Sequence, residues 1–178
     1  MSTKLNRIAI KARNNSQTKF TSLAHIITPE FLLETWKTMN KSGAGGIDGV
    51  SVKEFGNGLV ERLKETCERL KSNKYKAPPV RRVEIPKGGK SGKTRPLGIP
   101  TVEDRLVQKA VARILDAIFE QDFMNCSYGF RVNRNPHKAL SQLRSYIISR
   151  NVMQIYEADI RVVLQKYFLK NKRQRAFL

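Results

Sequence analysis

The chain has 178 residues, of which 40% are hydrophobic and 28% charged, and its formal net charge at pH 7 is +19. This length suits one domain with its own core, and the charge favours a polyanionic partner over a merely solubilising basic surface. The two cysteines stand apart, without a Cys or His close by in sequence, so a zinc site is not expected. No apolar stretch is long enough to span a membrane and the first residues are too polar for a signal peptide, which predicts a cytoplasmic protein with no membrane partner.

Residues 1–26 contain five cations and no acid. Their weak periodicity predicts a basic N-terminal arm, either mobile or a frayed helix. Such an arm fits an RNA-contacting extension and a disordered tail equally well.

Two helical segments are predicted next. Thr28-Pro29-Glu30 is a helix start, and Trp36 lies on the apolar stripe that follows, which indicates a core position. After the glycine-rich corner at residues 43–49, where Asp48 is a turn former, Ser51 and Glu54 form a capping box. We expect this box to open one long helix whose buried stripe comprises Val52, Phe55, Leu59, Leu63 and Leu70.

A strongly basic hairpin is predicted over residues 81–99. Val83 and Ile85 alternate with polar residues, and the run from Thr94 to Ile99 follows a loop with three glycines. The segment GGKSGKT within it lacks the spacing and the following helix of a nucleotide-binding P-loop. The hairpin contains one acid, Glu84, and six cations that could bind phosphate: Arg81, Arg82, Lys87, Lys90, Lys93 and Arg95.

Thr101 begins a further helix with a continuous apolar face: Leu106, Val107, Ala110, Val111, Ile114, Leu115, Ile118 and Phe119. Its polar residues, Arg105, Gln108, Lys109 and Arg113, could follow a nucleic-acid backbone or only solubilise the helix, and the sequence does not separate these readings.

The turn-rich segment 126–135 interleaves aromatic and cationic side chains, namely Tyr128, Phe130, Arg131 and Arg134. This pattern suits stacking on bases combined with phosphate contacts, or a packed loop. Asn135-Pro136 then starts a helix with Ala139, Leu140, Leu143 and Ile147 expected to face inward. Residues 152–161 are predicted to form a strand that places Glu157 and Asp159 on one face.

Four blocks of sequence resemble the group II intron-encoded reverse transcriptases, or maturases. They are GIDGV at residues 46–50, VRRVEIPK at residues 80–87, RPLGIPTVEDR at residues 95–105 and SYGFR at residues 127–131. The resemblance covers roughly residues 30–161 and implies an α+β fold, with helices around a small antiparallel fingers sheet and the first strand of a palm. It also implies copying of RNA into DNA and help with intron RNA folding.

The resemblance implies roles for particular residues. Lys87 and Arg95 would hold the incoming deoxynucleoside triphosphate with help from Arg81, while Arg82, Lys90, Lys93 and the aromatic and cationic residues of segment 126–135 would contact RNA template or DNA primer. Asp159 would be the catalytic carboxylate and, with the backbone carbonyl of Ile160, would ligate Mg²⁺, of which the family uses two ions.

The chain departs from the family after Asp159. No Asp or Glu follows it, so the later aromatic-x-Asp-Asp tetrad is missing, and residues 162–178 form a basic tail without the family pattern. We therefore expect a reading frame interrupted near residue 161, fingers and partial palm over residues 27–161, and no polymerisation by these 178 residues alone. An unfinished palm would leave a strand edge open to association. The alternatives are a non-catalytic RNA-binding module and a decayed gene product.

Overall fold

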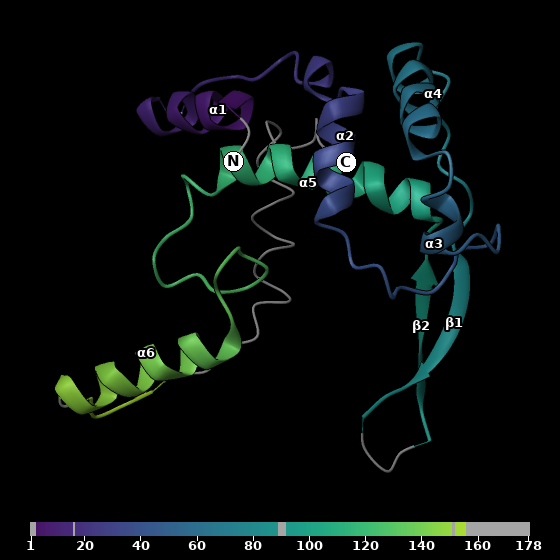
Figure 1. The fold of residues 1–178 in the computed structure, drawn as a ribbon. Helices are drawn as coiled ribbons and strands as arrows, with labels where there is room; N and C mark the ends of the chain where they lie inside the picture. Colours follow the sequence, from purple (N-terminus) through teal and green to yellow (C-terminus); the bar gives the residue numbers. More distant parts are fainter. Residues whose placement is uncertain (1–2, 16, 89–91, 151, 156–178) are drawn as a thin grey trace, which may run out of the picture. The chain divides into compact units, whose positions relative to one another are not determined.

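The computed structural model describes residues 3–15, 17–88, 92–150 and 152–155. The chain divides into two compact units, residues 1–124 and 125–178, and each is described by itself. The first unit contains α1 (Thr3–Asn14), the 3-10 helix η1 (Ala24–Ile26), α2 (Pro29–Lys37), α3 (Val52–Phe55), α4 (Leu59–Lys71), β1 (Arg81–Pro86), β2 (Thr94–Ile99) and α5 (Val102–Phe119) (Figure 1). The second contains α6 (Pro136–Ser149). Helices with a small antiparallel sheet agree with the predicted α+β class, and no helix in the described ranges is long and apolar enough to cross a membrane.

Helix α5 is the central element of the first unit. It contacts α1, α2 and α3, while α4 packs on α2 (Figure 1). Val102, Leu106 and Ala110 on its buried face are fully shielded from solvent. Other residues of the predicted apolar face are partly exposed to solvent: Val111 and Leu115 are 39% and 38% exposed. The buried stripe of α5 is therefore narrower than its hydrophobic sequence indicates.

Helix α1 is an integral part of this core. Leu5, Ile8, Ala9 and Ala12 are buried, at the spacing of one helical face, and α1 contacts α5. Of the two alternatives predicted for residues 1–26, residues 3–14 form the helix and not the mobile arm, and this helix is packed on the core. Half of this buried stripe is alanine, which gives a weak periodic signal in the sequence although it packs closely in the structure.

Helix α2 has the predicted beginning. The Thr28 hydroxyl accepts a hydrogen bond from the Phe31 amide, and Pro29 occupies the first turn. Trp36 is 9% exposed, and its ring centroid lies 5.4 Å from that of Phe55 in α3. The prediction that Trp36 belongs to the core is confirmed.

The capping box at Ser51 is confirmed, but the prediction of one long helix after it is wrong. The Ser51 hydroxyl accepts from the Glu54 amide at 3.2 Å, and the Glu54 carboxylate accepts from the Ser51 amide at 2.8 Å. The helix ends at Phe55, and Gly58, in a left-handed conformation (φ +66°), is the N-cap of α4, which begins at Leu59 as a separate helix. Leu63 is buried as predicted, whereas Leu59 and Leu70 are only half-buried and Thr66 and Cys67 complete the buried face.

The hairpin is confirmed. β1 and β2 pair antiparallel from Arg81 opposite Ile99 to Pro86 opposite Thr94. Val83 and Ile85 are half-buried and their neighbours in β1 exposed, as the alternation predicted. In Figure 1 the two strands lead away from the helices of the first unit, so their cations lie on open strands.

In the second unit, α6 begins as predicted but buries no side chain. The Asn135 side chain accepts from the Lys138 amide at 2.8 Å. Leu140 and Leu143, predicted to face inward, are instead 63% and 47% exposed. Residues 152–155 are described and have no strand structure, so the predicted strand is not seen there. Its remainder, residues 156–161, lies outside the described residues.

Candidate nucleic-acid interface

The register of the hairpin brings several of its cations to one face. Directly paired residues of an antiparallel ladder point to the same side, and residues two apart along a strand share that side. Arg95 is paired with Ile85, so it shares a face with Val83 and Arg81. The Lys87 amide donates to the Lys93 carbonyl oxygen at 2.7 Å, which extends the same pairing by one more step. One face thus presents Arg81, Lys87, Lys93 and Arg95, all of them exposed.

Within that face, Lys87 and Arg95 are neighbours and Arg81 is not. Lys87 lies two residues beyond Ile85, the partner of Arg95, which places it about 7 Å along the strand from that pair. Arg81 lies four residues away in the other direction, about 13 Å along the strand. Of the three residues predicted to hold the triphosphate, Lys87 and Arg95 therefore lie close together near the loop of the hairpin. Arg81 lies at the other end of the hairpin, near α5.

The opposite face carries Arg82, which forms an exposed ion pair with Glu84 at 2.8 Å. Such a pair is weak in water and leaves the guanidinium accessible. Lys90 lies outside the described residues, as do Asp159 and Ile160, which were predicted to ligate magnesium. In the part of the chain that the structure describes, no three His, Cys, Asp or Glu side chains are grouped so that they could hold a metal ion.

The predicted aromatic and cationic segment of the second unit forms a set of turns. The Arg134 guanidinium lies 5.0 Å from the Tyr128 ring centroid and donates to the Asn125 carbonyl oxygen. The Tyr128 hydroxyl bonds the Gln142 side chain of α6, and Arg131 donates to the Ser127 carbonyl oxygen at 2.8 Å. Phe130 is fully exposed on a left-handed backbone (φ +55°). The segment thus combines Phe130, a ring presented to solvent, with cations that partly stabilise their own turns.

The cations of α5 have a structural role that the sequence did not distinguish. Arg105 donates to the Ala44 carbonyl oxygen at 2.8 Å, and the Lys109 ammonium bonds the Thr38 carbonyl oxygen. Arg113 donates to the Thr35 hydroxyl at 2.5 Å and lies 4.6 Å from the Phe31 ring centroid. These side chains bind the C-terminal end of α2 and the loop after it, where carbonyl groups lack helical partners and the helix dipole is negative.

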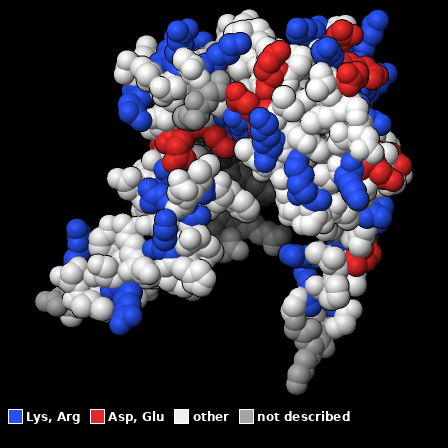
Figure 2. Space-filling view, viewed as in Figure 1, with Lys and Arg blue, Asp and Glu red and all other residues white. Residues whose placement is uncertain are grey.

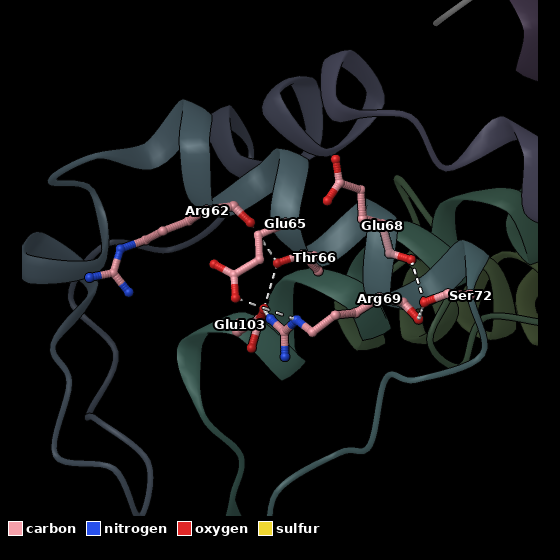
Figure 3. Close-up of polar contacts among 7 residues, drawn as sticks. All are labelled: Arg62, Glu65, Thr66, Glu68, Arg69, Ser72 and Glu103. Carbon is pink, nitrogen blue, oxygen red and sulfur yellow. Dashed lines mark hydrogen bonds and ion pairs between the residues drawn. The ribbon is translucent and has the colours of Figure 1, made fainter.

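A polar cluster joins α4 to the first turn of α5, directly after the hairpin. The Glu103 carboxylate accepts from the Thr66 hydroxyl and forms an ion pair with Arg69, while Glu65 lies 4.0 Å from the Arg69 Nε (Figure 3). Next to Glu103, the buried Asp104 accepts from the Tyr75 hydroxyl at 3.1 Å. Burial, followed by the Asp104 charge and hydrogen bond, raises the pKa of Tyr75 well above its ordinary value. The cluster fixes where β2 meets α5.

The basic character of residues 1–26 was predicted, but the groove that forms beside α1 was not. Lys4, Arg7 and Lys11 lie along α1 beside a groove that residues 19–26 close from the other side. Figure 2 shows Lys and Arg gathered over α1 in this view, whereas α4 carries both signs. The spacing of three and four residues between these cations was the available signal, and it was obscured by the alanines of the opposite face.

The chain matches no family model. It is 37% identical over 142 residues to Protein YkfC of Escherichia coli (strain K12), which covers 78% of this chain and 37% of that protein. It is 33% identical over 141 residues to the group II intron-encoded protein LtrA of Lactococcus lactis subsp. cremoris, covering 79% of this chain and 23% of that protein.

The putative COX1/OXI3 intron 2 protein of Saccharomyces cerevisiae is 30% identical over 165 residues, which is 92% of this chain and 18% of that protein. The 178 residues thus span between about a fifth and two fifths of the length of these relatives. Over most of its length, the chain belongs to the family of group II intron-encoded proteins.

Proposed function

We propose that this chain is the fingers part of a group II intron reverse transcriptase and maturase, and that it binds intron RNA. The observation that carries the proposal is the shared face of Arg81, Lys87, Lys93 and Arg95 on the hairpin, in a chain related to intron-encoded proteins. Four exposed cations on one face of two strands form a surface suited to a polyphosphate or a nucleic-acid backbone.

Lys87 and Arg95 are the pair that would hold the triphosphate of an incoming deoxynucleotide. They lie close enough for one triphosphate to bridge them, and they combine a point charge with a bidentate guanidinium. Arg81, farther along the same face, would assist by binding a neighbouring phosphate. Template RNA and a DNA primer would contact Lys93 on this face and Arg82 on the opposite face of the hairpin. In the second unit, the exposed Phe130 ring would offer a further contact for nucleic acid.

Magnesium would neutralise the triphosphate and activate the primer hydroxyl when bound. The Asp159 carboxylate and the backbone carbonyl of Ile160 are hard oxygen donors of the type that Mg²⁺ prefers, so they fit as one part of such a site. A two-metal centre needs further carboxylates, and no Asp or Glu follows Asp159 in these 178 residues. The 178-residue chain by itself is therefore expected to bind RNA without extending a primer.

Two assays test this proposal. In filter binding with an intron RNA, the variant R81Q/K87Q/R95Q should weaken binding and lower the salt dependence, with a slope reduced by about 2 to 3 for three lost phosphate contacts. The matched control K53Q/K64Q/K74Q removes three exposed lysines from the α3–α4 region and should retain the slope. Equal losses in both variants would show that the hairpin has no special role.

Primer extension separates polymerisation from RNA binding alone. With an RNA template, a DNA primer, magnesium and deoxynucleotides, the 178-residue chain should give no extended product while it retains RNA binding. Sustained synthesis that D159A abolishes would contradict the expectation. A non-catalytic RNA-binding module is the second candidate, because the exposed cations of the hairpin face can bind RNA without a catalytic carboxylate. It predicts that D159A leaves RNA affinity unchanged.

A further inference from the structure

The segment between α4 and β1 is fixed to the central helix at Tyr75. The Tyr75 hydroxyl donates to Oδ1 of Asp104 at 3.1 Å, and the Gln108 side-chain amide donates to Oδ2 of the same carboxylate at 2.6 Å. Asp104 is 5% exposed, and Tyr75 is half-buried. Each carboxylate oxygen therefore has a donor, and the phenol is bound to the first turn of α5.

Tyr75 is held from α4 as well. The Arg69 guanidinium lies 5.6 Å from the Tyr75 ring centroid, and it forms the ion pair with Glu103, the neighbour of Asp104 (Figure 3). The Tyr75 amide also donates to the Arg69 carbonyl oxygen at 3.0 Å. These four residues form a closed set of contacts between the end of α4 and the start of α5, which we call the Tyr75 anchor.

The chain that leads from the Tyr75 anchor to β1 is stiff. The pair Pro78-Pro79 fixes two φ angles and restricts the preceding residue to extended conformations. Val80 then packs against β2, where a Cβ atom on Gly98 would lie 2.9 Å from the Val80 Cγ2 atom. The anchor therefore determines where Arg81, the first residue of β1, enters the hairpin.

Arg81 depends on this support more than the other cations of its face do. It belongs to the first pair of the ladder, opposite Ile99, and a hairpin of only two strands is marginally stable without tertiary contacts. Lys87 lies six residues farther along the chain, about 20 Å from Arg81 in the strand direction. A change at the Tyr75 anchor should therefore affect Arg81 and leave the loop end of the hairpin in place.

We propose that Tyr75 and Asp104 are positioning residues for Arg81. Their hydrogen bond keeps the first pair of the ladder closed, so that Arg81 lies on the same face as Lys87 and Arg95 when phosphate binds. The inference rests on the proposed function for the identity of the ligand, and it deepens that proposal by explaining how one of the binding cations is held. Neither positioning residue needs to contact the ligand itself.

Amide hydrogen exchange of the 178-residue chain, measured by NMR without RNA, tests the support directly. Y75F removes only the hydroxyl, and it should raise exchange about ten-fold or more in residues 81–83 and 97–99 but little in residues 85–87. I114A is the control for a general loss of stability, because Ile114 is buried in α5 about 15 Å along the helix from Asp104. Unchanged exchange around Arg81 in Y75F, or an equal increase in I114A, would overturn the proposal.

A pair of Asp104 variants tests the acceptor. D104N retains an oxygen that can accept from the phenol, so it should keep most of the protection around Arg81, whereas D104A should raise exchange as Y75F does. Protection in D104A equal to that of the unmodified chain would count against the positioning role.

A double-mutant cycle in filter binding with an intron RNA connects the Tyr75 anchor to phosphate binding. R81Q should reduce the salt slope by roughly 0.7 to 0.9, the value for one phosphate contact. Y75F should lower RNA affinity about three-fold or more in the unmodified chain and in K87Q, but less than about 1.5-fold in R81Q, where the supported cation is already absent. Equal effects of Y75F in the R81Q and K87Q backgrounds would overturn the assignment to Arg81.

The variant R81Q/K87Q/R95Q, measured in parallel, separates this inference from the proposed function. If the triple variant loses RNA affinity while R81Q alone does not, the positioning inference is wrong and RNA binding by the hairpin stands. If the triple variant retains full affinity, both proposals fail.

Discussion

Gly46 packs directly against Thr101, so closely that a Cβ atom on Gly46 would lie 2.6 Å from the Thr101 Cα. Thr101 is the N-cap of α5, and its hydroxyl accepts from the Asp104 amide at 3.3 Å. The neighbouring turn is stabilised by Asp48, whose carboxylate accepts from the Val50 amide at 3.2 Å, as predicted for a turn former. The glycine-rich corner is thus held against the point where the hairpin joins the central helix.

Replacing Gly46 by alanine should destabilise the first unit. The added methyl group meets backbone atoms, which cannot move aside as a flexible side chain can, so overpacking costs about 2 to 3 kcal/mol. Urea unfolding monitored by Trp36 fluorescence measures the change in free energy. G88A is the matched control, because a Cβ atom there meets nothing within 4 Å. Equal stability of G46A and the unmodified chain would contradict the close contact.

The cations of α5 should contribute to stability and contribute little to RNA affinity. R105Q loses the hydrogen bond to the Ala44 carbonyl oxygen, and a charged donor of this kind is worth about 1.5 to 3 kcal/mol. K64Q, at an exposed position of α4, should change the free energy of unfolding by less than about 0.5 kcal/mol. A loss of RNA affinity in R105Q larger than in K64Q, without loss of stability, would show that Arg105 follows a backbone instead.

Local signals were sufficient for much of this fold. The caps at Thr28, Ser51, Thr101 and Asn135 were predicted because each depends on residues within one turn. The break between α3 and α4 was missed, although Gly56 and Gly58 are visible in the sequence, because the apolar stripe continues through them in phase. The roles of Arg105 and Lys109 could not be predicted, since their acceptors lie 61 and 71 residues away.

For the candidate site as well, the sequence predicted the features that depend on neighbouring residues and did not predict those that depend on contacts between distant segments. The alternation in β1 predicted the hairpin, and the pairing register that places Arg81, Lys87 and Arg95 on one face follows only from the structure. The groove on α1 was not predicted, because its second wall comes from residues 19–26, which have no helical pattern apart from the short η1. Asp159 remains a prediction from the family resemblance alone.

Glu103 and Glu65 offer a matched comparison around one arginine. Glu103 bonds both Arg69 and Thr66, and its side chain is 20% exposed, whereas the Glu65 side chain is 71% exposed and lies 4.0 Å from Arg69 (Figure 3). E103A should lower the free energy of unfolding by about 2 kcal/mol, and E65A by less than about 0.5 kcal/mol. A double-mutant cycle with R69M measures the coupling, and similar coupling for both glutamates would contradict the cluster as described.

The two cysteines should differ in reactivity, and the difference reports on the packing of α4. Cys67 is 2% exposed, with its thiol 3.6 Å from the Ile27 carbonyl oxygen, and burial raises its pKa above the ordinary value of 9.0. Cys126 is exposed. At pH 8 a thiol reagent should label Cys126 rapidly and Cys67 on the order of a hundred-fold more slowly, because Cys67 reacts only after local opening.

The raised pKa of Cys67 also fixes the sign of a pH effect on stability. The folded chain holds the thiol proton more tightly than the unfolded chain, so this contribution is complete below pH 9 and is lost as the pH rises toward the folded pKa. The free energy of unfolding should therefore fall more steeply in alkaline solution for the unmodified chain than for C67A, with C126A as the control that keeps the steeper dependence. In the labelling experiment described above, rapid labelling of both thiols in the native protein would contradict the burial of Cys67 between α4 and the segment before α2.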